Sequence, residues 1–342
     1  MTTSTSNRPD SPENHPEVDS NRTHPGKTVD KNVIVVGAGA WGKNLVRNFH
    51  DLNALAGVVE LNPSLRQQLA EQYPDLPLYA NYEDALGTEV PAIVIATPAP
   101  SHYPLALAAL KAGKDVFVEK PMTLEREQAQ ELATLADQRG QILMVGHLLL
   151  YQPAITWIQD YLNSGQAGAL WHVATRRLKL GRVRQQENVW WSFAPHDLAV
   201  ILALLNQPAI AEVQAHGRTF LQPGIADTVQ ANLTFATGQT AALHCSWYWP
   251  LVERSTVVVT EKQMIVYDEV AQTVTIHHKF VDQALQQCDG GTEVIDIAHS
   301  QPLKLECQHF LDCLASRQPP RSDGWQGVAV VDILAQVQQF LS

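Results

Sequence analysis

The chain has 342 residues, which is enough for two domains that each bury a core of their own. Its composition, with 45% hydrophobic and 17% charged residues, is that of a globular protein and excludes a disordered or fibrous one. The formal net charge of −11 argues against nucleic acids and acidic membranes as partners, although a local basic patch can still bind a phosphorylated small molecule.

The segment from Met1 to Lys31 is rich in Ser, Thr, Asn, Pro and Asp and has almost no large apolar side chains, so we expect a disordered tail there. The chain has neither the apolar core of a secretion signal nor an apolar run of membrane-spanning length, which predicts a cytoplasmic protein. Its four cysteines form no CxxC pair, and we expect free thiols and no structural metal.

Short apolar runs alternate with helical patterns between residues 32 and 146. Predicted strands cover residues 33–36, 55–59, 92–95, 116–118 and 142–145, and predicted helices start at Trp41 or cover residues 63–72, 102–111 and 124–138. Continuous apolar strands separated by helices indicate a parallel sheet that is covered on both faces. With right-handed crossovers, this pattern predicts a doubly wound α/β domain over residues 32–146.

The pattern changes over residues 147–342, where strands follow one another with few helices between them. Helices are predicted over 153–163, from near Pro195 to before Gln207, and over 303–315 and 327–341; strands are predicted over 170–175, 211–219, 227–235, 240–247, 255–260 and 264–267. Closely spaced strands indicate an α+β domain with a mostly antiparallel sheet. Its last helices are candidates to pack back onto the first domain.

The turn after the first strand is Gly37-Ala38-Gly39-Ala40-Trp41-Gly42, a GxGxxG pattern that opens a helix. Its first glycine permits a tight turn, its second lets the backbone approach a pyrophosphate, and its third allows close packing of helix and strand. The free N–H groups at the start of the helix then bind phosphate. We therefore expect residues 37, 39, 40, 41 and 42 to hold a dinucleotide.

Glu60 ends the second predicted strand, where a carboxylate can accept both ribose hydroxyls of an adenosine and repel a 2′-phosphate. This favours NAD over NADP. An exposed glutamate at a strand end is the alternative, and Arg66 is near enough in sequence to aid a 2′-phosphate.

Two stiff turns follow later strands, Thr97-Pro98 and Glu119-Lys120-Pro121. Ligands of open α/β sheets bind beyond the carboxyl ends of the strands, so we expect both turns beside the cofactor. His102 either contacts the cofactor or only supports the start of its helix. Lys120 faces the cleft in this arrangement, where burial and a nearby positive nicotinamide would favour its neutral amine.

These motifs, followed by Gly146-His147, resemble the Gfo/Idh/MocA oxidoreductase family, and the resemblance runs from Asn32 to Ser342. It implies an N-terminal Rossmann domain, a C-terminal open-faced sheet that forms homodimers or homotetramers, and NAD(P)-linked oxidation or reduction of sugars, inositols or sugar nucleotides. It also implies that Lys120 lies at the substrate and that His147 lies near the nicotinamide, unless His147 belongs to the core.

Family members commonly carry an aspartate four residues before a histidine in the second domain. This chain keeps His196 but has Ser192 at the aspartate's position. The resemblance makes His196 the general acid/base, because its ordinary pKa is near 6.5, and leaves open how the ring is oriented and whether Ser192 contacts the substrate. A buried structural histidine is the alternative. Asp197 is either part of the site or a carboxylate at a helix start.

Five basic residues precede His196, namely Arg176, Arg177, Lys179, Arg182 and Arg184. They belong either to a solvated strand edge or to a site for a diphosphate, for which Arg176 and Arg182 are the named candidates. This part of the chain resembles the subgroup that modifies sugar nucleotides for surface polysaccharides, with oxidation at the sugar 3-position as the first expected reaction.

The sequence thus predicts an NAD-dependent dehydrogenase acting on a secondary alcohol of a sugar, and no nucleic-acid or membrane partner. One alternative is a dehydrogenase of free sugars or inositol. Another is a non-catalytic sensor of nucleotides or sugars on the same fold, although a sensor has no need of proton-transfer groups such as Lys120 and His196.

Overall fold

The structure is a computed structural model that describes residues 31–298 and 300–341; the predicted N-terminal tail lies outside them except for Lys31. The elements of the first part are β1 (Val33–Val36), α1 (Gly42–Asp51), β2 (Leu55–Val59), α2 (Pro63–Gln72), β3 (Leu78–Tyr79), α3 (Tyr82–Leu86), β4 (Ala92–Ile95), η1 (Ala99–Ser101), α4 (His102–Lys111), β5 (Asp115–Glu119), α5 (Arg126–Arg139) and β6 (Leu143–Gly146). The remaining elements are η2 (Leu148–Tyr151), α6 (Pro153–Asn163), β7 (Leu170–Leu178), α7 (Val189–Leu204), β8 (Ile210–Arg218), β9 (Thr228–Phe235), β10 (Thr240–Ser246), β11 (Glu253–Thr260), β12 (Met264–Asp268), β13 (Thr273–Val281), β14 (Gln287–Ile295), α8 (Pro302–Ser316) and α9 (Gly324–Gln338).

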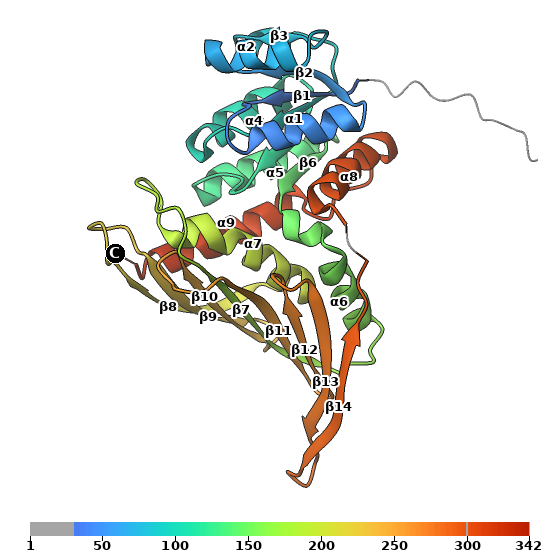
Figure 1. The fold of residues 1–342 in the computed structure, drawn as a ribbon, viewed down its shortest axis with the longest axis vertical. Helices are drawn as coiled ribbons and strands as arrows, with labels where there is room; N and C mark the ends of the chain where they lie inside the picture. Colours follow the sequence, from blue (N-terminus) through green and yellow to red (C-terminus); the bar gives the residue numbers. More distant parts are fainter. Residues whose placement is uncertain (1–30, 299, 342) are drawn as a thin grey trace, which may run out of the picture. The chain divides into compact units, whose positions relative to one another are not determined.

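The first sheet is parallel and has the order β3-β2-β1-β4-β5-β6 (Figure 1). Strands β1, β4 and β5 are buried at every residue, because helices cover both faces and a buried parallel strand tolerates only apolar side chains at most positions. This is the predicted doubly wound arrangement, and it brings the ends of β1, β4 and β5 to one edge.

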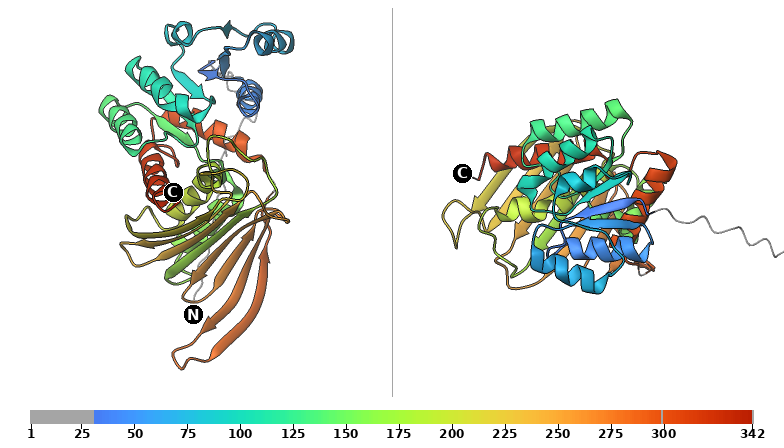
Figure 2. Two further views of the ribbon diagram at one scale, coloured as in Figure 1. Left: turned by 90° about the vertical axis from the view of Figure 1, so that its left-hand side faces the viewer. Right: turned by 90° about the horizontal axis from the view of Figure 1, so that it is seen from above.

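The second sheet has the order β14-β13-β12-β11-β7-β10-β9-β8 and is antiparallel except for the parallel pair β7–β10. Helices α6 and α7 lie on one face, and no described helix covers the other face (Figure 2). The predicted mixture of a Rossmann sheet and a mostly antiparallel, open-faced sheet is therefore confirmed.

The last two helices return to the first sheet. Helix α8 packs against α1, and α9 packs against α5, β6 and α7. The backbone N–H of Val145 donates to the carbonyl of Ser322 (2.8 Å), so the segment before α9 covers the free edge of β6. No helix among the described residues is both long and apolar enough to cross a membrane.

Helix α7 differs from its prediction. It begins at Val189 rather than near Pro195, and the side chain of Asn188 caps it by accepting a hydrogen bond from the backbone N–H of Trp191 (3.2 Å). The expectation of a start near Pro195 was wrong because proline is common at helix starts, whereas here it lies inside the helix. Asp197 is consequently an interior helix residue and not a helix-start carboxylate.

Candidate active site

The glycine-rich turn between β1 and α1 is tight on its inner side and open on its outer side. Gly37 has φ +88°, and a Cβ added to Gly42 would lie 2.0 Å from the carbonyl oxygen of Gly37. A Cβ added to Gly39 would meet no atom within 4 Å. The turn thus requires glycine at two positions and leaves room at the third for an extended anionic group to approach the backbone and the start of α1.

Glu60 is buried and supports this turn. Its two carboxylate oxygens accept hydrogen bonds from the backbone N–H groups of Ala38 and Asn62, both 2.8 Å long. Each oxygen keeps a second lone pair for a hydroxyl group. The guanidinium of Arg66 donates to the carbonyl oxygen of Glu60 (2.7 Å), so the two residues weighed for cofactor choice lie together.

His102 joins the two turns that follow β4 and β5. Its Nδ1 lies 2.8 Å from the carbonyl oxygen of Pro121, and its Nε2 lies 2.8 Å from that of Thr97. Burial lowers the pKa of this imidazole, the two carbonyls oppose that effect, and Lys120 adds to it. His102 does not line the cleft described below, so it supports the two turns from behind.

Glu119 ends β5 and is fixed from two sides. The indole Nε1 of Trp41 donates to its Oε1, and the backbone N–H of Lys120 donates to its Oε2 (3.3 Å). A Cβ on Gly146 of the neighbouring strand would lie 3.0 Å from this carboxyl group, which therefore needs glycine beside it. Burial raises the pKa of Glu119 to about 7, against the hydrogen bond from Trp41 and the charge of Lys120.

Lys120 points across to the second part of the chain, where its Nζ donates to the backbone carbonyl of Ser192 in α7 (3.0 Å). Pro195 lies in the same helical turn, and because it has no backbone N–H, it leaves the carbonyl of Trp191 without its usual helical partner. Burial lowers the pKa of Lys120 below its ordinary value, and Arg184 and Arg177 act in the same direction. Glu119 and Glu187 oppose the shift.

Two histidines near Lys120 have ring nitrogens that are buried without a hydrogen-bond partner among the described residues, namely Nδ1 of His196 and both nitrogens of His147. Burial lowers the pKa of His196 well below its ordinary value, and it lowers that of His147 to about 3. Lys120 contributes to both shifts. His196 lines the cleft, whereas His147 does not, although its neighbours in sequence Gly146 and Leu148 do.

These parts meet around a cleft of about 560 Å³. Its walls include residues from the cofactor side (Trp41, Thr97, Glu119 and Lys120) and from the second part of the chain (Lys179, Arg184, Ser192 and His196). The predicted residues Gly37, Gly39, Ala40, Gly42, Glu60, Pro98, His102, His147, Arg176 and Arg182 do not line this cleft.

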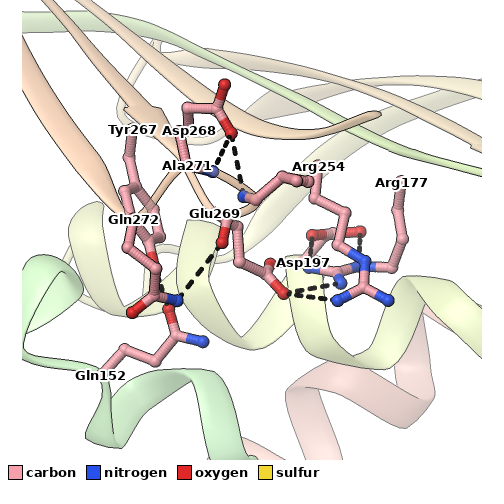
Figure 3. Close-up of polar contacts among 10 residues, drawn as sticks. Gln152, Arg177, Asp197, Arg254, Tyr267, Asp268, Glu269, Ala271 and Gln272 are labelled. Carbon is pink, nitrogen blue, oxygen red and sulfur yellow. Dashed lines mark hydrogen bonds and ion pairs between the residues drawn. The ribbon is translucent and has the colours of Figure 1, made fainter. Parts of the chain in front are cut away.

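A network of charges, most of them buried, forms part of the cleft wall, and half of its members carry no signal in the sequence. Arg177 makes two hydrogen bonds with Asp197 (2.9 and 3.0 Å) and two with Glu269 (2.9 and 3.5 Å), which also accepts one from Arg254 (3.3 Å; Figure 3). Burial opposes the charge on Arg177, but Asp197 and Glu269 raise its pKa. No sequence spacing reveals this network, because the strand register alone places Arg177 opposite Arg254.

The five basic residues before His196 separate in the structure. Arg176 and Arg177 are adjacent in β7 and point to opposite faces; Arg176 is exposed, pairs with Glu253 (3.3 Å) and does not line the cleft. Lys179 lines the cleft with its Nζ 5.4 Å from the centre of the Phe193 ring. Arg184 lines it beside Lys179, whereas Arg182, which lies between these two residues in the same loop, does not line it.

Known proteins resemble this chain over most of its length. UDP-N-acetylglucosamine 3-dehydrogenase from Acidithiobacillus ferrooxidans is 27% identical over 310 residues, which are 89% of this chain and 95% of that enzyme. A solved structure of that enzyme has a TM-score of 0.80 at 26% identity and covers 91% of this chain and 99% of its own. Inositol 2-dehydrogenase from Serratia proteamaculans is 27% identical over 188 residues, 53% of this chain and 56% of that enzyme.

A more distant structure, GenD2 from gentamicin A biosynthesis in complex with NAD, shares the fold with a TM-score of 0.78 at 21% identity and covers 92% of this chain and 95% of its own. A model of the GFO/IDH/MocA oxidoreductase family with an NAD-binding Rossmann fold matches residues 31–147, and a model of its C-terminal domain matches residues 156–266. These matches confirm the predicted enzyme class, a nicotinamide-dependent dehydrogenase of CH–OH groups. The chain belongs to the GFO/IDH/MocA family of oxidoreductases.

Proposed function

We propose that this protein is an NAD-dependent dehydrogenase that oxidises a secondary alcohol of a nucleotide-linked sugar. One observation carries the proposal: Lys120 Nζ is anchored at a cleft that His196 also lines, at the carboxyl end of β5 and beside the glycine-rich turn. An amine with a lowered pKa in that position is suited to accept a hydroxyl proton.

The turn fits a dinucleotide because its outer side is open at Gly39 and leads to the start of α1. Glu60 would accept the ribose hydroxyls and so favour NAD over NADP. Trp41, Thr97, Pro98 and Glu119 would lie along the nicotinamide half. When bound, the nicotinamide supplies the acceptor for the hydrogen that leaves the carbinol carbon with its bonding electrons.

Lys120 is the residue that we assign to the proton. Its neutral amine takes the proton of the substrate hydroxyl as the carbonyl forms, and the Ser192 carbonyl holds Nζ in place throughout. Burial together with Arg184 and Arg177 makes the neutral amine available at a lower pH than in a free lysine.

His196 serves as the second polar contact to the same hydroxyl. Because burial and the neighbouring cations disfavour its protonated form, His196 is a poorer proton acceptor than Lys120, and we assign it the orientation of the substrate by a hydrogen bond. Ser192 contributes through its backbone carbonyl, which accepts the hydrogen bond from Lys120 Nζ.

The finer assignment to a nucleotide-linked sugar rests on the similarity to UDP-N-acetylglucosamine 3-dehydrogenase along nearly the whole of both chains. We propose oxidation at the sugar 3-position, in a pathway to surface polysaccharides. Residues 32–146 would bind the cofactor and residues 147–342 the substrate. The uncovered face of the second sheet would form a homodimer or homotetramer.

The test is to incubate purified protein with NAD or NADP and with UDP-N-acetylglucosamine, free N-acetylglucosamine or myo-inositol, and to follow the absorbance of the reduced cofactor. We expect reduction of NAD with the sugar nucleotide. Turnover of myo-inositol or free sugar alone would instead establish the free-polyol alternative. Binding of NAD without turnover of any polyol would favour a sensor.

A further inference from the structure

A second, wider groove opens next to the active-site cleft and has a volume of about 1050 Å³. It lies between the turn after β4 and the loop from Arg182 to Asn188 that leads into α7. Ala99, Arg184 and Glu187 line both cavities, so the two adjoin each other. Neither Lys120 nor His196 lines the wider groove, which therefore offers binding without the groups of the reaction.

The narrower cleft has to hold two ligand parts at once. Its volume of about 560 Å³ must accommodate the reacting sugar ring and the nicotinamide together, whereas drug-sized ligands alone occupy pockets of ~300–1000 Å³. The remainder of such a substrate has to leave the cleft, and the shared wall at Arg184 marks an exit into the wider groove.

Positive charge gathers at this junction. Lys179 makes no ion pair with any described residue, and its pKa is lowered by burial and by Arg254, Arg177 and Arg184, with no carboxylate opposing the shift. Arg184 is close to Glu187 (3.4 Å), and Glu125 is the other carboxylate of the wider groove. Arg182 lines this groove without an ion-pair partner in the part of the chain that the structure describes.

The far wall carries groups that recognise a planar, hydrogen-bonding ring. Trp191 is partly buried, and its indole Nε1 donates to Gln338 Oε1 (3.1 Å), which also accepts a hydrogen bond from Asn188 Nδ2 (2.8 Å). The side-chain amide nitrogen of Gln338 donates a hydrogen bond to no described residue. An indole face with an available amide beside it suits stacking and edge recognition of a nucleobase.

We propose that the wider groove binds the nucleoside of a nucleotide-linked substrate, with the diphosphate at Lys179, Arg184 and Arg182 and the sugar at Lys120. This inference rests on the proposed function, which it extends by assigning a site to the part of the substrate that does not react. The residues of the groove are remote from the reacting carbon. Substitutions there should therefore change the affinity for the substrate rather than the rate of turnover.

The experiment is a calorimetric titration of UDP into protein that is saturated with NADH, so that the glycine-rich turn is already occupied. We expect UDP to bind to the NADH complex and Lys179→Met and Arg182→Met each to weaken this binding about tenfold or more, because each removes a charged contact to phosphate. Arg176→Met is the matched control. It removes an arginine that lines neither cavity, and UDP affinity should not change.

Steady-state kinetics provide the second readout. For the sugar nucleotide, Arg182→Met should raise KM with little change in kcat, and Trp191→Phe should have a smaller effect than Arg182→Met because it keeps an aromatic face. Absence of UDP binding to the NADH complex, or equal losses in Arg176→Met and Arg182→Met, overturns the inference. If the protein nevertheless reduces NAD with free sugars, the dehydrogenase activity stands and only the nucleotide-binding site is rejected. If the protein binds no dinucleotide at all, the proposed function itself is rejected.

Discussion

Lys120 is the residue on which the chemistry depends, because its Nζ lies at the cleft while its backbone continues into the stiff turn at Pro121. We expect Lys120→Met to lower kcat by about 10²–10⁴-fold, the usual range for loss of a general acid/base, because methionine fills the space but accepts no proton. Affinity for NAD, measured by fluorescence quenching, should change only a few fold.

Lys111→Met provides the control, since Lys111 is exposed at the end of α4. It should retain full turnover. Equal turnover in Lys120→Met and the unaltered protein would remove Lys120 from the mechanism.

The charges around Lys120 also predict a dependence on pH. Glu187 raises the pKa of Lys120, so Glu187→Gln should lower that pKa and make the neutral amine available at a lower pH. The rise of kcat/KM for alcohol oxidation with pH should therefore move to lower pH, by on the order of half to one unit.

Glu187→Asp keeps the negative charge and should leave the profile close to that of the unaltered protein. An alkaline shift in Glu187→Gln would show that another group controls the profile. The same measurement on Lys120→Met should show no rise that responds to residue 187.

Among single residues, the sequence predicted those whose residue type and spacing form a known pattern. Gly37, Gly42, Lys120 and His196 stand in recognisable patterns, and the structure places them along or beside one cleft. Arg254 and Glu269 carry no such signal, because a charged residue on a strand is ordinary until its neighbour in the sheet is known. The register of β7 with β11 supplies that neighbour.

Strand β7 shows how one element separates two adjacent arginines. Arg177 points to the helix-covered face and holds together Asp197 and Glu269, which come from α7 and from the turn after β12. Arg176 points to the other face and makes one exposed pair with Glu253. The alternation of side chains along a strand, rather than any difference in residue type, decides which arginine is structural.

We therefore expect Arg177→Met to destabilise the protein far more than Arg176→Met. Removing Arg177 leaves two buried carboxylates without their main partner, and losing one member of a buried charge network costs about 3–5 kcal/mol. An exposed pair contributes about 0–1 kcal/mol. Urea unfolding followed by circular dichroism gives the two free energies, and similar losses in both variants would contradict this account of β7.

Helix α7 and the strands β13 and β14 show where element prediction fails. Pro195 is a start signal in isolation, yet the cap at Asn188 and the buried Val189 and Trp190 extend the helix to both sides of it. The sequence from Gln287 to Ile295 has two glycines and little alternation, so the strand β14 depends on its pairing with β13. The sequence of a strand predicts it poorly when pairing with the neighbouring strand supplies most of its stability.

For the whole molecule, the periodicity of residues 32–146 was sufficient to predict five of the six described strands of the first sheet, because a parallel sheet needs apolar strands with a helix between each pair; the two-residue strand β3 was not predicted. The joining of the two halves was not predictable in detail. Helices α8 and α9 come last in the sequence, yet α8 packs against α1 and the segment before α9 pairs with β6. Only long-range packing determines this arrangement.

The return of α8 places one more ionisable group in the interior, namely Glu306. Glu306 is fully buried, and both its carboxylate oxygens lack a hydrogen-bond partner among the described residues. Burial raises its pKa well above the ordinary value, and the charge of Glu119 adds to the shift. A neutral Glu306 is thus the form that the fold accommodates.

This arrangement predicts that the stability contributed by Glu306 falls as pH rises. A carboxyl group whose pKa is raised by folding binds its proton more tightly in the native state, so its contribution is complete below the unfolded pKa near 4.5 and is lost as pH passes the higher native value. Glu306→Gln stays neutral and escapes this loss. We expect its free energy of unfolding, relative to that of the unaltered protein, to increase between pH 5 and pH 8.5 by about 1.4 kcal/mol for each unit of the native shift lying in that range.

Comparison with the unaltered protein at each pH is essential, because buried histidines such as His147 have lowered pKa values and contribute a stability that instead increases with pH. These contributions are common to both proteins and cancel in the difference. Lys304→Gln is the control on the same helix, since Lys304 is exposed and its replacement should leave the difference independent of pH. A difference that stays constant with pH would mean that Glu306 is charged in the folded protein. An ion pair or a water molecule would then stabilise its carboxylate, in place of the neutral acid inferred from its burial.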